Sequence, residues 1–158
     1  MTEATHGTSG FTGPHRFHME AWIGCAPFER LLHLTIVMAE DGRATLTMPF
    51  LVDYAQGAGL MHGGAIATLA DTAVVMAIKS VVAPGSHFAT IESKMRYLYP
   101  VKQGVITARA RIAPPDDRRI EGRASVYDDT DRAVAEFSAT FKLARDTRIA
   151  AITFADVP

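Results

Sequence analysis

The stretch MHGGAIATLADTAVVMAI, residues 61–78, decides how this chain folds. Two glycines follow a histidine, and an alanine-rich apolar run then carries a single charged side chain, Asp71. Its length and composition predict a buried helix that begins at the two glycines and ends near Val82, ahead of the helix-breaking sequence Ala83-Pro84-Gly85. A helix that is apolar on nearly all sides must be covered all round.

The segments on either side of this helix have the patterns of strands. Residues 31–50 form two strand-like runs around Asp41-Gly42, a turn signal for a hairpin. Alternation in residues 89–99 predicts a half-buried strand with Thr90 on its polar face. Further strands are expected at 104–112, 118–128 and 132–144, continuing as an antiparallel meander. One twisted sheet wrapped around one helix fits this order, which is an α+β architecture.

The chain of 158 residues is expected to form one domain over residues 18–145. Residues 1–17 are predicted to be a flexible leader without the apolar core of a signal peptide, and residues 146–158 a C-terminal tail. Residues 19–30 predict a short helix limited by Pro27.

Charge and cysteine content restrict the partners that we expect. The net charge of −1 gives no footprint for nucleic acid or an anionic membrane. The apolar stretch 59–78 contains Asp71, His62 and glycines, which favours a buried helix over a membrane span. The single cysteine, Cys25, excludes an intrachain disulfide and fits a cytoplasmic location.

The arginines are unevenly distributed along the chain. Eight of the twelve lie between Arg96 and Arg145, in the part predicted to form strands. This cluster is either a local anion site or ordinary solvated strand surface.

The two glycines place bare backbone at the start of the helix. The first turn of a helix has unpaired N–H groups and a partial positive charge, so Gly63 and Gly64 offer an oxyanion hole or an anion site. The alternative is that His62-Gly63-Gly64 only caps the helix and bends the chain into it.

Asp71 lies too far along the helix to act beside those amides in the same chain. Eight residues at 1.5 Å each separate it from Gly63 by about 12 Å, whereas reacting groups meet within about 3–3.5 Å. If both act, they come from different subunits of a two-fold dimer with two composite sites. The alternative is a structural carboxylate bonded to backbone N–H groups, serine or threonine.

The stretch LMHGGAIATLADTAVVMAIKS resembles the hotdog-fold acyl-CoA thioesterases, in particular the PaaI-like group of phenylacetic acid degradation. The group's G-x-x-HGG and helical L-A/V-D are filled by Gly59, His62-Gly63-Gly64 and Leu69-Ala70-Asp71. The resemblance continues through 90–104, with the pattern Y-x-x-P-x-x-x-G, and covers roughly residues 30–145.

The resemblance implies a hotdog fold, a homodimer that is often a dimer of dimers, and thioester hydrolysis. Asp71 would act as general base or nucleophile, the Gly63 N–H would polarise the thioester carbonyl, and His62 would position the loop and substrate. The family has an asparagine where this chain has Gln56, whose longer side chain changes its reach. Thr90 matches the family's serine or threonine near the start of the strand after the helix.

No cofactor or metal is expected, because histidine and cysteine spacing offers no ligand set. Coenzyme A enters only as part of the substrate. Its phosphates need cations, for which Arg118, Arg119 and Arg123 are candidates, with solvated strand ends as the alternative. Gly64 is the further candidate for substrate binding, as part of the helix N-terminus.

Two other functions compete with the thioesterase. One is a hydratase or dehydratase on the same fold, in which His62 and a carboxylate move protons. The other is a non-catalytic acyl-CoA-binding module. The sequence does not specify the acyl group.

Overall fold

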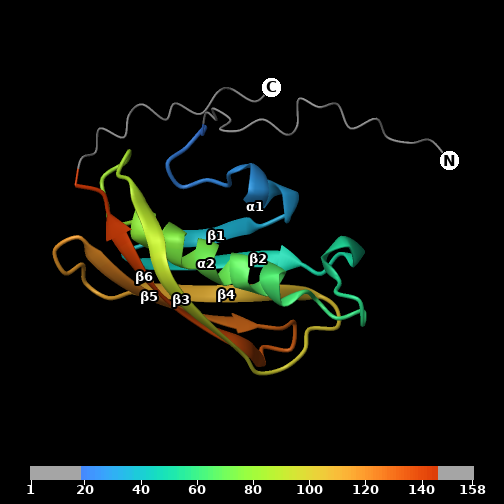
Figure 1. The fold of residues 1–158 in the computed structure, drawn as a ribbon. Helices are drawn as coiled ribbons and strands as arrows, with labels where there is room; N and C mark the ends of the chain where they lie inside the picture. The colour runs from blue at the N-terminus through green and yellow to red at the C-terminus, as the bar shows by residue number, and fades with distance from the viewer. Residues whose placement is uncertain (1–18, 146–158) are drawn as a thin grey trace, which may run out of the picture.

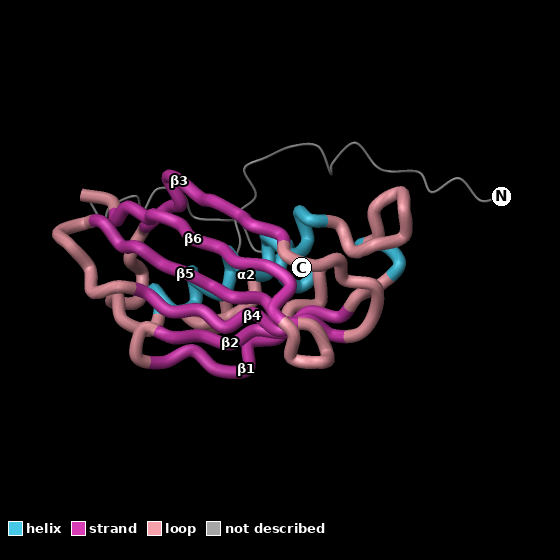
Figure 2. The backbone as a smooth tube through the Cα atoms, turned by 90° about the horizontal axis from the view of Figure 1, so that it is seen from below, coloured by secondary structure: helices cyan, strands magenta, loops and turns pink. Residues whose placement is uncertain are grey.

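A computed structural model describes residues 19–145, which form an antiparallel sheet around one long helix (Figure 1). The helical elements are α1 (Pro27–Leu31), the 3-10 helix η2 (Val52–Tyr54) and α2 (Gly63–Lys79). The strands are β1 (Thr35–Glu40), β2 (Arg43–Pro49), β3 (Phe88–Tyr97), β4 (Val105–Ile112), β5 (Arg119–Tyr127) and β6 (Ala133–Leu143). Their order in the sheet is β1-β2-β4-β5-β6-β3 (Figure 2). The predicted α+β architecture, a sheet wrapped on a central helix, is confirmed.

Helix α2 lies along one face of the sheet and packs against β2, β4 and β5 (Figure 1). Ala70, Ala73 and Ala77 have no exposed surface, and these small side chains let the helix approach the strands closely. At Gly122 of β5 the helix lies so close that an added Cβ atom would be 2.1 Å from Cγ1 of Val74. The buried helix expected from residues 61–78 is therefore confirmed.

The helix ends earlier than the expected position near Val82. The Ser80 N–H donates to the Met76 carbonyl, and the Ser80 hydroxyl donates to the Ala77 carbonyl at 2.7 Å. The same hydroxyl accepts a hydrogen bond from the Gly42 N–H at 2.9 Å. Ser80 thus ends α2 and ties it to the turn between β1 and β2.

The hairpin predicted around Asp41-Gly42 is confirmed, and both turn residues have positive φ, +49° and +72°. The helix predicted over residues 19–30 is wrong in its extent. Pro27 is its first residue and not its limit, because the N–H that proline lacks would have no intrahelical partner at the first helical position in any case.

The predicted meander is correct for β4, β5 and β6, but wrong for β3. Strand β3 crosses over to pair with β6, and β4 pairs with β2 instead. As an edge strand that contacts α2 through Thr90 and Tyr97, β3 is exposed along most of its length. The half-buried pattern expected from its alternation is therefore absent in the single subunit.

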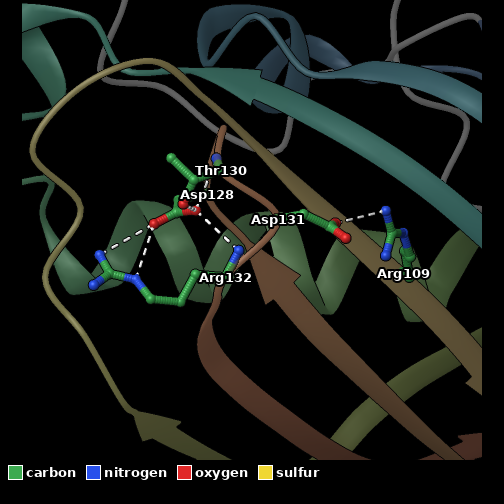
Figure 3. A network of polar contacts seen from close by, with 5 residues as sticks. All are labelled: Arg109, Asp128, Thr130, Asp131 and Arg132. Atoms are coloured by element: carbon green, nitrogen blue, oxygen red, sulfur yellow. Dashed lines mark hydrogen bonds and ion pairs between the residues drawn. The ribbon is translucent and has the colours of Figure 1, made fainter.

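The turn between β5 and β6 is held by Asp128 (Figure 3). Its carboxylate accepts hydrogen bonds from Thr130 and from the backbone N–H and guanidinium of Arg132. These bonds, the Thr130 hydroxyl first among them, lower the pKa of Asp128 to about 2. The Arg132 guanidinium in turn lies 4.6 Å from the centre of the Tyr99 ring, so this turn anchors the connection between β3 and β4.

Two features of the described residues bear on the partner expectations. No helix within 19–145 has the length and hydropathy needed to cross a membrane. Over the same residues, no group of three or more His, Cys, Asp or Glu side chains lies close enough to hold a metal ion. The predicted leader over residues 1–17 and tail over residues 146–158 lie outside the described residues.

Candidate active site

The predicted catalytic residues gather at two places along α2, which we call the glycine half-site and the acid half-site. The glycine half-site is the start of the helix with Gln56, His62, Gly63 and Tyr97. The acid half-site is Asp71 with Thr90, further along the same helix.

His62 caps the helix in the glycine half-site. Its Nδ1 accepts a hydrogen bond from the Gly64 N–H at 2.8 Å, so a neutral ring carries its proton on Nε2. The His62 backbone N–H donates to the Tyr54 carbonyl at 2.7 Å, which fixes the loop before the helix. With the Gly64 N–H engaged by the cap, the Gly63 N–H is the glycine amide left open to a ligand.

Tyr97 of β3 completes this half-site. Its hydroxyl donates to the Gly63 carbonyl at 2.8 Å. A Cβ atom on Gly63 would lie 2.9 Å from that hydroxyl oxygen and 3.0 Å from the ring carbon that bears it. Glycine is therefore needed at position 63 for the tyrosine to lie against the helix start. Sequence reasoning placed Tyr97 only within the Y-x-x-P pattern and gave it no role.

A pocket of about 370 Å³ opens at the glycine half-site, lined by Gln56, Gly63 and Tyr97 together with Ile66 and Tyr99. The Gln56 side-chain oxygen accepts from the Ala58 N–H within its own loop. Its amide nitrogen is the part of the side chain left to contact a ligand. The structure thus brings Gln56 and Gly63 to one pocket.

Asp71 in the acid half-site is half-buried, and its Oδ1 accepts a hydrogen bond from the Thr90 hydroxyl at 3.2 Å. Burial raises the pKa of the Asp71 carboxyl above 3.8, the hydrogen bond from Thr90 opposes this rise, and the nearby charge of Glu29 adds to it. A half-buried carboxylate with a raised pKa is a stronger base than an exposed one.

The expectation that Thr90 lies on the polar face of its strand is wrong. A register shift between Thr90 and Glu92 inserts one extra residue, Ile91, into β3. Thr90 therefore pairs with buried Phe141, whereas Glu92 pairs with Thr140. A β-bulge of this kind re-aims a side chain, and here it turns the Thr90 hydroxyl toward the helix.

A second pocket, of about 270 Å³, lies beside the acid half-site and is lined by Trp22, Val75, Lys79, Thr90 and Phe88, among others. Trp22 and Lys79 hold each other: the indole N–H donates to the Lys79 carbonyl and the Lys79 ammonium to the Trp22 carbonyl. Sequence reasoning missed Trp22, since no pattern in the chain links residues 22 and 79.

The two half-sites do not meet within one subunit. Gly63 and Asp71 belong to one uninterrupted helix, which keeps them about 12 Å apart at 1.5 Å per residue. Strand β3 contributes a residue to each half-site, Thr90 near its start and Tyr97 at its end. The acid and the open amide therefore lie along the same exposed edge of the molecule.

The three arginines proposed for coenzyme A are placed differently from one another. Arg118 donates to the Leu143 carbonyl at 3.3 Å and is partly buried. Arg119 and Arg123 are exposed on β5, four residues apart, which is about 13 Å along a strand. Arg123 lies on the sheet face that points away from α2, because the neighbouring Gly122 faces the helix.

Comparisons with known proteins agree with this fold and with the helix at its centre. Residues 58–135 match the family model described as "Thioesterase superfamily". A protein of Halobacterium salinarum named "Putative esterase" is 32% identical over 110 residues, which span 66% of this chain and 72% of that protein.

Solved structures give the same result. A conserved protein of Pseudomonas aeruginosa superposes with a TM-score of 0.75 at 26% identity, covering 80% of this chain and 100% of the other. A mutant of the phenylacetic acid degradation protein PaaI of Thermus thermophilus superposes with a TM-score of 0.68 at 25% identity, covering 74% and 98%. The fold is thus the hotdog fold of the PaaI-like proteins. This chain belongs to the thioesterase superfamily, and that membership supports a hydrolase.

Proposed function

We propose that this protein is an acyl-CoA thioesterase that works as a homodimer with two composite sites. Asp71 of one subunit and the Gly63 N–H of the other act on the same thioester. The observation that carries the proposal is the pair of half-sites on α2: a half-buried acid bonded to Thr90, and an open amide at the helix start. Each is incomplete alone, since thioester hydrolysis needs both a base or nucleophile and an oxyanion donor.

The chemistry follows from these positions. The Gly63 N–H and the helix N-terminus stabilise the negative charge that develops on the thioester oxygen. Asp71 takes a proton from the attacking water and returns it to the departing thiolate, so that free acid and thiol are released. Attack by the carboxylate itself, followed by hydrolysis of the anhydride, gives the same products. The Thr90 hydroxyl occupies one oxygen of Asp71, which leaves the other for the water or the substrate.

Pairing through β3 is the expected way to bring the half-sites together. An unpaired strand edge is a template for another strand, and β3 is a ten-residue edge with Ile91 and Tyr97 about half exposed. A second copy placed against this edge by a two-fold axis would set two α2 helices antiparallel. The Asp71 of each would then face the glycine half-site of the other.

The hydratase alternative has less support in the geometry. It needs a histidine that exchanges protons beside a carboxylate, but His62 uses Nδ1 to cap its own helix and lies nine residues from Asp71. Release of free thiol without hydration of an enoyl-CoA substrate separates the two reactions. Tight acyl-CoA binding with neither reaction would indicate the non-catalytic module.

Replacement of Asp71 by asparagine tests the proposal. We expect Asp71→Asn to fold and to lose turnover by about 100-fold or more, because the base contribution alone is worth about 10²–10⁴. The measurement is thiol release from a panel of short, long and aromatic acyl-CoA substrates. The matched control is Asp117→Asn, an exposed turn residue with φ of +52° that asparagine adopts as readily. Equal turnover of Asp71→Asn and wild type would remove Asp71 from the mechanism.

A further inference from the structure

The face of the sheet opposite α2 carries a hollow of about 760 Å³ that the proposed function does not use. Six cationic side chains line this hollow against one carboxylate, that of Glu136. The cations are Arg43, Lys94, Arg96, Arg109, Arg111 and Arg123. They come from β2, β3, β4 and β5, which lie side by side with β6 in the sheet (Figure 2).

Three of these arginines form a straight line across the strands, which we call the arginine row. Arg43 of β2 is the register partner of Arg111 of β4, and Arg111 is the register partner of Arg123 of β5. Neighbouring strands are about 4.8 Å apart, so the row spans about 10 Å. Like charges directly opposite each other destabilise a sheet, and this row sets three together.

No acidic side chain within residues 19–145 forms an ion pair with the arginine row. The ion pairs of this face join Arg96 to Glu136 at 3.6 Å and Arg109 to Asp131 at 3.0 Å. Within residues 19–145 no ion pair involves the row itself. All three guanidinium groups are exposed and keep their full hydrogen-bonding capacity.

The arginine row is separate from the two half-sites. Ala44, Ala110 and Ala124, which follow or precede the three arginines, are buried against the helix side of the sheet. Because side chains alternate along a strand, the arginines point to the other face. A ligand on the row therefore occupies a different surface of the subunit from Asp71.

We propose that the arginine row binds a small anion that carries two or more phosphate groups. Guanidinium groups match phosphate oxygens in a two-pronged geometry, and three of them in line suit a chain of phosphates. On one side of the row, acids lie in the next line across the strands, where Glu121 of β5 and Glu92 of β3 both pair with Thr140 of β6. Those carboxylates and the net charge of −1 oppose an extended polyanion such as nucleic acid.

Binding of ADP, measured by calorimetry on the full chain at low salt, tests this proposal. We expect saturable binding that weakens as salt is added, because exposed charges are screened. Arg111→Gln, at the centre of the row, should weaken binding at least ten-fold. Arg145→Gln removes the same charge from an exposed position outside the row and should leave it unchanged. Inorganic phosphate should bind less tightly than ADP.

Thermal unfolding without ligand shows whether the variant is intact. Arg111→Gln should unfold at or above the wild-type temperature, because it relieves repulsion between like charges. Absence of ADP binding to wild type, or equal ADP affinity of Arg111→Gln and wild type, would overturn the proposal. Equal affinities for ADP and inorganic phosphate would overturn the requirement for two phosphates.

Such an anion can be a free nucleotide or the nucleotide part of coenzyme A. Competition between ADP and acyl-CoA distinguishes these two sources. If ADP binds the row without changing thioester hydrolysis, the ligand is a free nucleotide. If ADP competes with acyl-CoA, and Arg111→Gln abolishes the competition, the row holds the nucleotide part of the substrate. The arginine row itself does not depend on the proposed function, and ADP binding tests it even if no thioester is hydrolysed.

Discussion

At the scale of single residues, opposing influences act on the pKa of the Asp71 carboxyl. Burial raises the pKa of its carboxyl, and the hydrogen bond from Thr90 lowers it. The bond also fixes the orientation of the carboxylate, since it engages one of the two oxygens. We therefore propose that Thr90 is a positioning residue, whose removal should change the pH profile as well as the rate.

Thr90→Val should move the acidic limb of the pH–kcat profile to higher pH. The base acts only when ionised, so activity is lost as the pH falls through the Asp71 pKa. Without the hydroxyl, the opposing influence disappears and that pKa rises further above 3.8. The measurement is kcat against pH for wild type and variant. Thr90→Ser, which keeps a hydroxyl, should restore the wild-type limb, and an unmoved limb in Thr90→Val would contradict the role of this bond.

The Gly63 N–H can be removed without breaking the helix. Gly63 is the first residue of α2, a position where proline is favoured, and His62 before it is extended at φ −62° and ψ 131° as proline requires. Gly63→Pro should lower kcat by about 10²–10³, the usual loss of one oxyanion donor.

The control for that variant is Gly63→Ala, which adds a Cβ against Tyr97 but keeps the N–H. The loss of kcat in Gly63→Ala measures the effect of displacing the tyrosine. The further loss of kcat in Gly63→Pro measures the contribution of the N–H donor. Circular dichroism and size-exclusion chromatography check that both variants fold and assemble. Equal kcat for the two variants would show that the N–H takes no part.

At the scale of elements, the contact between β5 and α2 sets how close the helix lies to the sheet. This distance in turn sets the positions of both half-sites. Gly122→Ala should lower the free energy of unfolding by about 1–3 kcal/mol, the usual cost of overpacking a core. The new Cβ would lie 2.1 Å from a methyl of Val74, whose β-branched side chain has little freedom to move away.

Urea denaturation measures this change. Gly57→Ala is the matched control, since a Cβ there meets no atom within 4 Å. Its stability should stay within about 0.5 kcal/mol of wild type, as for other surface substitutions. A Gly122→Ala variant as stable as Gly57→Ala would show that the helix can shift away from the sheet at no cost.

The sequence predicts those elements whose causes are local. The apolar run with paired glycines predicts α2, and Asp41-Gly42 predicts the first hairpin, because each depends on neighbouring residues. The placement of β3 at the far edge beside β6 does not follow from alternation, which is the same for any neighbour. The bulge at Ile91 is also invisible to a period of two, and it is what turns Thr90 to the helix.

The site could be predicted only in part for the same reason. Asp71 stands out in the sequence as the one charged residue of an apolar run, and Gly63 as a glycine at the predicted start of the helix. Tyr97 and Trp22 come to the half-sites through contacts across 34 and 57 residues. Such contacts depend on the folded sheet and leave no periodic pattern in the chain.

At the scale of the whole molecule, we propose that an active site needs two subunits. Within one subunit the acid and the open amide are held about 12 Å apart by a continuous helix. The exposed edge at β3 borders both half-sites and is the surface where a second copy would complete them. Under this proposal, pairing of the subunits and catalysis are one property of the assembly.

Complementation between two inactive variants distinguishes a composite site from a site within one chain. A purified heterodimer of an Asp71→Asn subunit and a Gly63→Pro subunit keeps one composite site intact and loses the other. We predict that it regains about half of the wild-type turnover per dimer, although each parent homodimer is inactive. The reciprocal heterodimer, in which one subunit is wild type and the other carries both substitutions, should be inactive. No recovery in the first heterodimer, with activity in the second, would place the whole site within one chain and contradict the account.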